Sequence, residues 1–269
     1  MAGGLAKALP RAVAVGADVL QIFVANPRGW APPAADPAGD ATFAATCHLP
    51  VFVHAPYLLN FGSPSAETLA RSTEALRFSL ERGAAIGALG VVMHAGSSVL
   101  GNRRDDAIAQ VREHVLPVLD AVPDGPRLLV EPTAGGGGAL ASDAASLGAY
   151  LDALGRDQRI GVCLDTCHMH AAGHDLSTPK SFRAALRAYA RTAGPGGIGL
   201  IHVNDSRDPA GSKRDRHEAI GHGTIGADAF SALFTTPVTR KVPMVVETSD
   251  TQHAADIATL TALRTAALL

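Results

Sequence analysis

Short apolar runs rich in branched side chains alternate along this chain with longer stretches rich in Ala, Leu and Arg. The longer stretches predict helices at residues 65–83, 104–119, 142–154, 180–192 and 254–268. The short runs predict seven strands, at residues 19–25, 51–54, 91–94, 128–131, 160–165, 199–203 and 244–247. Residues 26–40, which contain four prolines, predict an irregular loop. The alternation is typical of βα units around a parallel sheet, so we expect an α/β protein.

The length of 269 residues suits one large barrel, because α/β barrels commonly run to about 250 residues as a single domain. No composition break or low-complexity linker divides the sequence. We therefore predict a TIM-type (β/α)8 barrel in a single domain, residues 1–269. The barrel needs one strand more than the seven found, and the chain opens on MAGGLAKAL, a Gly-Gly loop leading into a helix. The first strand is thus expected to be missing at the N-terminus: either the barrel is open there or the true chain starts upstream, and we favour a misassigned start site.

Composition narrows the possible partners and the compartment. Hydrophobic residues make up 47% and charged residues 18% of the chain, which is enough apolar material for a large core. The formal charge of -2 gives no global attraction for nucleic acid or anionic membrane, so a polyanion needs a local site. The apolar run at residues 13–25 is interrupted and too short to span a bilayer, and no signal peptide is visible. The three cysteines are too few for a disulfide framework, so a reducing cytoplasm is expected.

Six of the seven predicted strands carry a metal-ligating residue type at or near the carboxyl end. One such residue is more often a hydrogen-bonded core group than a ligand, but six in succession indicate a site. In α/β barrels the active site forms at this rim, and a buried imidazole or carboxylate there must be paired or bind a metal. The six residues are His54, His94, Glu131, Asp165, His202 and Glu247.

Three further residues extend this set to nine. His168 follows Asp165 by three positions, and Asp215 and His217 form a D-x-H pair whose side chains point to the same side of an extended segment. Five imidazoles and four carboxylates suit zinc or manganese. Nine side chains are too many for one ion and suit a cluster of two or three, which would attract phosphate. We expect Cys163 to be core packing and Cys167 to be packing at the rim rather than a ligand.

The chain resembles the endonuclease IV family of apurinic/apyrimidinic endonucleases, which are trizinc TIM-barrel enzymes of DNA repair. The resemblance extends from Ala2 to the final helix and fills all nine ligand positions. It implies one xylose isomerase-like TIM-barrel domain. The matching blocks are HAPYLLNFGSP from His54, HAGS from His94, EPTAGGG from Glu131, GVCLDTCHMHAAGHD from Gly161, HVNDS from His202, DRHEAIGHGTIG from Asp215 and VVET from Val245.

The resemblance implies three zinc ions per chain and a hydrolytic reaction at abasic sites of double-stranded DNA. The phosphodiester 5′ to the lesion would be cut to give a 3′-hydroxyl and a 5′-deoxyribose phosphate, and Glu131 would position the attacking water. No organic cofactor and no membrane are implied, and a monomer is expected. The implied ligands are His54, His94 and Glu131 for one zinc, Glu131, Asp165, His202 and Glu247 for the second, and His168, Asp215 and His217 for the third.

Two kinds of loop are expected to contact DNA. Loops carrying Arg28 and Trp30 and, after the second strand, Tyr57, Leu58 and Asn60 resemble family loops that enter the duplex at the lesion. Ordinary packing at the rim is the alternative for Trp30 and Tyr57. The loop at residues 207–216 is locally basic once Asp215 is committed to metal, and a solvated loop is its alternative. Its cationic residues are Arg207, Lys213, Arg214 and Arg216.

Two departures from the family and two rival functions remain open. Pro132 stands where the family often has Asn, and His222 where it often has Glu, although neither replaces a ligand. A sugar isomerase or epimerase of the xylose isomerase-like barrels would need only a quartet of Glu131, Asp165, His202 and Glu247. That reading leaves five candidate ligands without a role. A non-catalytic protein that binds abasic DNA is the second rival.

Overall fold

The computed structural model describes residues 4–99 and 103–267, and its contacts group into two compact units. The first unit comprises Met1–Glu131 with Tyr150–Gly161, and the second comprises Pro132–Ala149 with Val162–Leu269. The boundary falls within helix α5 (Ala144–Ala153) and strand β5 (Ile160–Asp165). The single domain at residues 1–269 stays a prediction.

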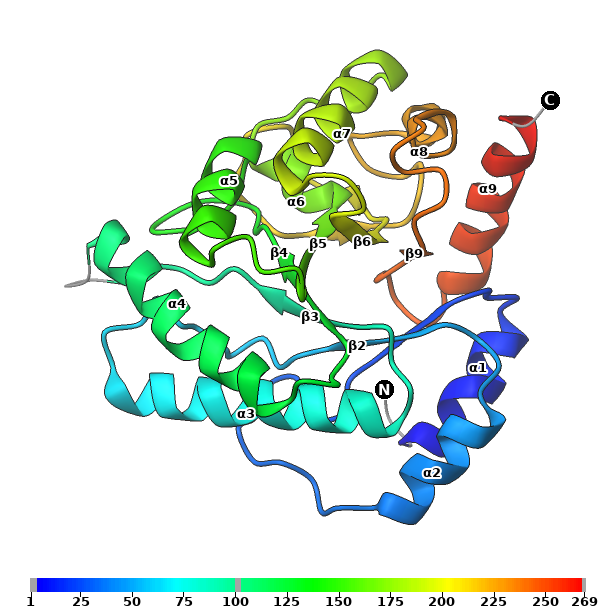
Figure 1. Ribbon diagram of the computed structural model, residues 1–269. Coiled ribbons are helices and arrows are strands. Elements are labelled where there is room, and N and C mark those ends of the chain that lie inside the picture. The colour runs from blue at the N-terminus through cyan, green and yellow to red at the C-terminus, as the bar shows by residue number, and fades with distance from the viewer. Residues whose placement is uncertain (1–3, 100–102, 268–269) are drawn as a thin grey trace. The chain divides into compact units, whose positions relative to one another are not determined.

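Four parallel strands form the centre of the first unit (Figure 1). They are β1 (Leu20–Ile22), β2 (Val51–His54), β3 (Gly90–His94) and β4 (Arg127–Glu131), paired in that order. Every residue of β2 is buried, which explains its continuous apolar run, since parallel strands are covered on both faces. The register pairs His94 with Glu131, so the polar ends of neighbouring strands meet at one edge.

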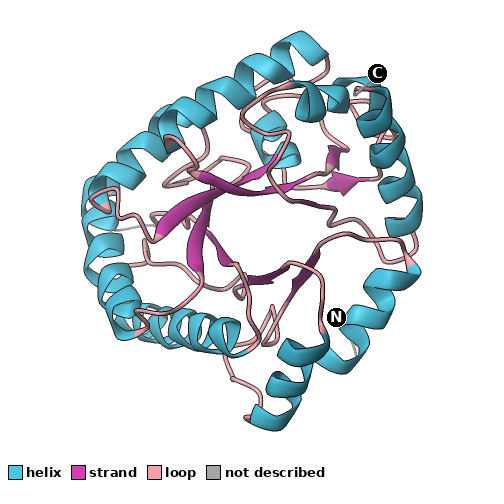
Figure 2. Ribbon diagram, turned by 45° about the vertical axis from the view of Figure 1, so that its right-hand side comes forward, coloured by secondary structure: helices cyan, strands magenta, loops and turns pink. Residues whose placement is uncertain are grey.

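The first unit carries its helices on one side of these strands (Figure 2). The short helix η1 (Leu5–Lys7) leads into α1 (Ala8–Ala14), and α2 (Pro37–Thr46), α3 (Ala66–Ala85) and α4 (Arg104–Ala121) follow. Helices α3 and α4 lie side by side in Figures 1 and 2. Ser65 caps α3 by accepting a hydrogen bond from the Thr68 N–H, and Leu76 and Leu80 bury its inner face.

The loop predicted at residues 26–40 is shorter than expected, because α2 already begins at Pro37. The Asp36 carboxylate accepts a hydrogen bond from the Gly39 N–H at 3.0 Å, which caps the helix. Proline is well suited to the first helical position, because its missing N–H has no partner there in any case. The four prolines indicated an irregular loop, but the last of them, Pro37, is the first residue of a helix.

The second unit contains three parallel strands and one antiparallel pair. Strand β5 pairs with β6 (Ile198–His202), which pairs with β9 (Met244–Val245). The register places Asp165 opposite His202 and His202 opposite Val245. Strands β7 (Asp205–Ser206) and β8 (His217–Glu218) pair antiparallel and join the two ends of the basic loop. This pair was not predicted, because two-residue strands carry no readable periodicity.

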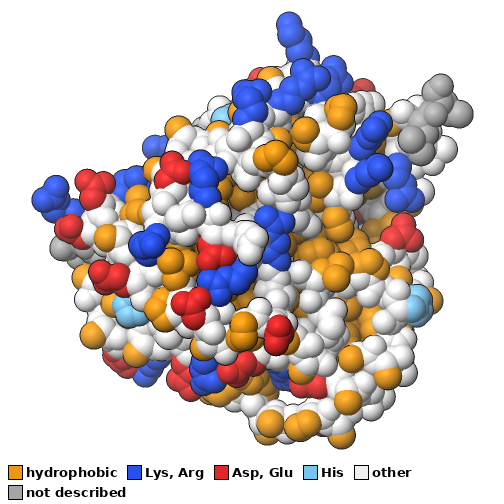
Figure 3. All heavy atoms as spheres, in the orientation of Figure 1, with side chains coloured by type: hydrophobic (Ala, Val, Ile, Leu, Met, Phe, Trp, Pro, Cys, Tyr) orange, Lys and Arg blue, Asp and Glu red, His pale blue; other side chains and the backbone are white. Residues whose placement is uncertain are grey.

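The helices of the second unit include α6 (Thr166–Ala171), α7 (Pro179–Ala193), η2 (Ala227–Phe230), α8 (Ser231–Thr235) and α9 (His253–Ala266). Helix α6 was not predicted, because it has only 6 residues and begins directly after β5. Lys and Arg side chains gather over α7 (Figure 3). The predicted helix at residues 254–268 is confirmed as α9, except that Leu268 lies outside the described residues.

All seven predicted strands are confirmed, with bounds that match or differ by a few residues, and so are the five predicted helices. Within residues 4–99 and 103–267 no strand precedes β1, as the missing first strand requires. No helix in that part of the chain has the length and apolar character needed to cross a bilayer.

Candidate metal centre

The first unit brings three of the predicted ligands together at the ends of β2, β3 and β4. The Nε2 atoms of His54 and His94 each lie 3.4 Å from Oε2 of Glu131, and one ligand atom from each residue lies within 4.8 Å of the others. His54 and Glu131 are buried, whereas His94 is partly exposed. The strand register produces this cluster, because His94 and Glu131 are direct partners across β3 and β4.

The hydrogen bonds of His54 determine which of its nitrogens faces the cluster. Its Nδ1 lies 2.6 Å from the Ala55 carbonyl oxygen, so Nδ1 carries the hydrogen and donates it. The Nε2 lone pair then faces the Glu131 carboxylate, an arrangement that is repulsive unless a proton or a cation lies between them. Metal-binding histidines are usually held in this way, by a hydrogen bond from the other ring nitrogen to a carbonyl. The donor set therefore fits a divalent ion.

Tyr57 packs over both histidines of this cluster. Its ring stacks on His94 with centroids 5.6 Å apart and meets His54 edge-on at 5.2 Å. Phe23 contacts both Tyr57 and His54, with ring centroids 5.3 Å and 5.1 Å away. Because Tyr57 remains 44% exposed, it both covers the imidazoles and presents a face to solvent. The two roles considered for Tyr57, packing and DNA contact, are therefore compatible.

The second unit brings His168, Asp215 and His217 together. The Asp215 carboxylate lies 3.1 Å from Nε2 of His168 and 3.0 Å from Nε2 of His217. Nδ1 of His168 is 3.1 Å from the Pro132 carbonyl oxygen, so this imidazole also presents Nε2 to the cluster. Since the contact uses a backbone carbonyl, the family departure at Pro132 leaves it intact.

The charges of this second cluster act strongly on one another. Burial opposes ionisation of Asp215, but hydrogen bonds from His168 and His217 outweigh it and hold the pKa of Asp215 well below its ordinary value. Burial also opposes a charge on His217, yet the carboxylates of Asp165, Asp215 and Glu247 raise its pKa to about 9. The acidic groups thus stabilise a positive charge at this point, whether a proton or a metal ion supplies it.

The third set lies at the ends of β5, β6 and β9. Nδ1 of His202 is 3.0 Å from Oε2 of Glu247 and 3.9 Å from Oδ2 of Asp165, which in turn is 3.6 Å from Nε2 of His217. Asn204, which sequence reasoning missed, lies between the two acids. Its side-chain amide donates to Asp165 at 2.7 Å and to Glu247 at 3.3 Å. The one available signal was its position two residues after His202.

Two cysteines lie buried among the predicted ligands. Cys163 and Cys167 are both fully buried, and Cys167 lies close enough to Asp165 and His217 to be a geometric candidate for a metal. Burial and the neighbouring Asp165 charge raise the pKa of the Cys167 thiol to about 12. That Cys167 packs at the rim and does not bind metal stays a prediction.

The basic loop is internally paired. All four of its predicted DNA-contacting residues are exposed. Arg216 hydrogen-bonds Asp208, Arg214 lies 3.6 Å from the same carboxylate, and Arg207 lies 3.1 Å from Glu218. The hydrogen bond from Arg216 holds the pKa of Asp208 below its ordinary value. Lys213 adopts a left-handed backbone conformation, with φ of 58°, at the tip of this loop.

The remaining predicted DNA contacts lie in the first unit. Arg28 is exposed, Trp30 is half-buried, and Leu58 is 37% exposed. Asn60 accepts hydrogen bonds from the Gly62 and Ser97 N–H groups, both at 3.0 Å, so its side chain joins the loops after β2 and β3. Contact of these residues with DNA, and metal binding by the nine ligands, stay predictions.

Comparison with known proteins gives consistent matches along nearly the whole chain. Residues 9–265 match the family model described as "Xylose isomerase-like TIM barrel", which confirms the predicted fold class. A protein of Streptomyces coelicolor named "Probable endonuclease 4" is 51% identical, over 98% of this chain and 92% of that protein. The crystal structure of endonuclease IV from Thermus thermophilus is 32% identical, with a TM-score of 0.85 over 98% of this chain and 95% of that one.

A likeness to sugar epimerases concerns the fold alone. The structure of an L-ribulose 3-epimerase superposes with a TM-score of 0.73, over 98% of this chain and 90% of the other, at only 20% identity. Barrels of this kind support many unrelated reactions, so the choice between them depends on the site.

Proposed function

The chain belongs to the endonuclease IV family of xylose isomerase-like TIM barrels, and from this membership we infer that it is a DNA-repair hydrolase. We propose that it cuts duplex DNA at abasic sites, on the 5′ side of the lesion. In this reaction the oxygen of a water molecule bonds to phosphorus while the bond from phosphorus to the 3′-oxygen breaks. A proton from the water ends on the 3′-hydroxyl, and the deoxyribose phosphate keeps the 5′-phosphate.

The nine predicted ligands would hold three zinc ions, in the sets that the family resemblance implies. His54, His94 and Glu131 hold the first. Bound zinc would acidify a water molecule and neutralise charge on the phosphate, which is the chemistry that phosphodiester hydrolysis needs. By the same resemblance, Glu131, Asp165, His202 and Glu247 would hold the second, and His168, Asp215 and His217 would hold the third.

The protein's own groups orient the reactants. Glu131 is buried and fixed at the end of β4, and we propose that its carboxylate positions the attacking water. The exposed Tyr57 and Leu58 and the half-buried Trp30 would occupy the space of the missing base. An abasic nucleotide has no base to unstack, so it costs least to rotate out of the duplex. Arg207, Lys213, Arg214 and Arg216 would contact the DNA backbone beside the lesion.

The observation that carries this proposal is the cluster of His168, Asp215 and His217. A sugar epimerase needs only the quartet, and it has no use for a second set of ligands converging within 4.8 Å. A protein that only binds lesions has no need of the metal-ligand pattern at all. Three ligand sets, supplied by the ends of strands, by α6 and by the segment at residues 215–217, favour hydrolysis of a phosphodiester.

The test uses the zinc-loaded protein and a duplex with one tetrahydrofuran abasic analogue, which cannot undergo β-elimination. The wild type should leave a nick 5′ to the analogue with a 3′-hydroxyl end. Glu131→Gln should lower the rate by about a hundredfold or more, whereas the exposed Glu113→Gln should not change it.

His217→Ala distinguishes the two enzyme classes, because it removes a ligand that an epimerase would not need. Loss of incision in this variant, with about three zinc ions per wild-type chain, supports the proposal. An intact strand at high concentration of the zinc-loaded wild type, or conversion of a keto-sugar by both proteins, would reject it.

A further inference from the structure

The loop at residues 25–36 is held at both ends by one side chain, Arg82 of α3. Its Nη1 donates to the Val24 carbonyl oxygen at 2.9 Å, where the loop leaves the end of β1. Its Nε and Nη2 donate to Asp40 at 3.1 Å and 3.0 Å, in the first turn of α2 where the loop ends. A single planar guanidinium therefore ties together two chain segments that the whole loop separates.

This contact is buried and well formed. The side chains of Arg82 and Asp40 are only 15% and 10% exposed. Arg77 and Glu81 form an ion pair on the same helix, but their side chains are each 47% exposed. Exposed pairs of this kind contribute little, whereas a buried bidentate pair fixes geometry, because both partners lose their water and depend on each other.

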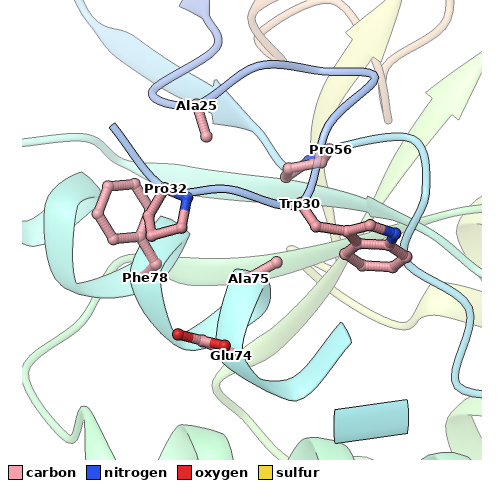
Figure 4. A pocket seen from close by; sticks show the side chains of 7 residues that line it. All are labelled: Ala25, Trp30, Pro32, Pro56, Glu74, Ala75 and Phe78. Carbon is pink, nitrogen blue, oxygen red and sulfur yellow. The ribbon is translucent and has the colours of Figure 1, made fainter. Parts of the chain in front are cut away.

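A backbone hydrogen bond links the loop to the segment that follows β2. The Tyr57 N–H donates to the Pro27 carbonyl oxygen at 2.9 Å, which links the loop to the residue that packs on His54 and His94. Trp30 lines a small pocket together with Pro32, Pro56 and Phe78, whose side chains are drawn in Figure 4. The loop is thus held at its two ends by Arg82 and, at Pro27, by the backbone of Tyr57.

We propose that Arg82 is a positioning residue that holds the loop bearing Arg28 and Trp30 in the shape needed for DNA recognition. The consequence for DNA rests on the proposed function, whereas the positioning itself does not. A loop that is ordered before binding loses less conformational entropy on association. Arg82 therefore lowers the concentration of DNA needed for half-maximal incision without contacting DNA.

The test compares Arg82→Lys with Arg77→Lys on the same helix. Lysine keeps the positive charge beside Asp40, but one ammonium group cannot satisfy Asp40 and Val24 in the bidentate geometry of arginine. Trp30 is the single tryptophan of the chain, so its fluorescence reports this loop directly. Arg82→Lys should make Trp30 more accessible to acrylamide quenching and should raise KM for the abasic duplex about fivefold to tenfold, with kcat unchanged. Arg77→Lys should change neither.

A merely structural role for Arg82 would lower the melting temperature and the active fraction, and so kcat, while KM and quenching stayed the same. That outcome, or a folded Arg82→Lys variant with wild-type quenching, overturns the proposal. If Arg82→Lys does not fold, Asp40→Asn removes the same ion pair from the other side and should give the same increase in quenching. If the wild type does not cut abasic DNA, the proposed function fails, but the quenching measurement still decides whether Arg82 positions the loop.

Discussion

Asn204 shows how one uncharged side chain can organise two predicted ligands. It is fully buried, and its amide N–H group donates to both Asp165 and Glu247 while its amide oxygen accepts from the Glu247 N–H at 2.9 Å. The Thr166 hydroxyl fixes the Asn204 backbone through two hydrogen bonds, of 2.6 Å and 2.8 Å. Asn204 thus holds both carboxylates beside His202.

Replacing Asn204 with Leu should weaken zinc binding by about tenfold to a hundredfold, because groups behind the ligands set their orientation. Competition with a chromophoric chelator measures the change. Gln252→Leu removes an amide from a surface turn and should leave chelator competition unchanged. Unaltered zinc affinity in Asn204→Leu would show that the hydrogen bonds from Asn204 do not orient Asp165 and Glu247 for zinc binding.

At the residue scale, the candidate ligands could be predicted from the sequence, but the residues that hold other side chains and loops in place could not. A His or carboxylate at the end of an apolar run is visible in the sequence, because a strand buried on both faces excludes such groups elsewhere. In the sequence, Arg82 and Asn204 look like ordinary polar residues, because only the fold brings their hydrogen-bond partners close to them. Arg82 meets Asp40 across 42 positions of sequence, and no local pattern encodes that separation.

At the scale of elements, a buried aspartate organises the segment that follows the basic loop. Asp205 in β7 is fully buried, and its carboxylate accepts hydrogen bonds from five backbone N–H groups. The donors are Ser206, Gly221, Gly223, Ile225 and Gly226, at distances of 2.8 to 3.2 Å. This carboxylate replaces the regular backbone pairing that residues 219–226 lack.

Asp205→Asn should destabilise the protein by about 3 kcal/mol or more, because the amide NH2 would face backbone donors and leave several of them unsatisfied. Urea unfolding of the metal-free protein measures the loss without a contribution from zinc. The exposed Asp228→Asn, in the neighbouring η2, makes the same chemical change and should stay within about 0.5 kcal/mol of the wild type. Equal stability of the two variants would mean that the N–H groups find other acceptors.

The same network explains which elements the sequence could not predict. Strands β2 and β5 have the predicted bounds, since both are long enough for burial to shape their composition. Strands β7 and β8 are two residues each and exist because Asp205 and its donors hold the chain around them. Helix α6 begins because the Asp165 carboxylate caps it, accepting from the His168 N–H at 2.7 Å. Tertiary contacts, and not local propensity, determine these elements.

At the scale of the whole chain, the net charge of -2 means that DNA must be attracted by particular surfaces. The described part of the chain includes two basic surfaces. One is the loop at residues 207–216, in which Asp208 and Glu218 pair with three arginines and hold them in place. The other is α7, where Lys180, Arg183, Arg187 and Arg191 recur at helical spacing along one face. Only the loop is joined through β8 to a predicted ligand, His217.

Salt dependence distinguishes the two surfaces. Each phosphate contact releases counterions, so losing one cationic contact should lower the slope of log affinity against log salt by about 1. Lys213→Gln and Arg187→Gln each change the net charge from -2 to -3, so a purely global effect would be identical in both. We expect the smaller slope only in Lys213→Gln, measured by titrating a catalytically inactive Glu131→Gln background with the abasic duplex at several salt concentrations. An equal change of slope in the two variants would mean that DNA binding depends on the net charge of the whole molecule. A change of slope in Arg187→Gln alone would mean that DNA contacts α7 and not the loop.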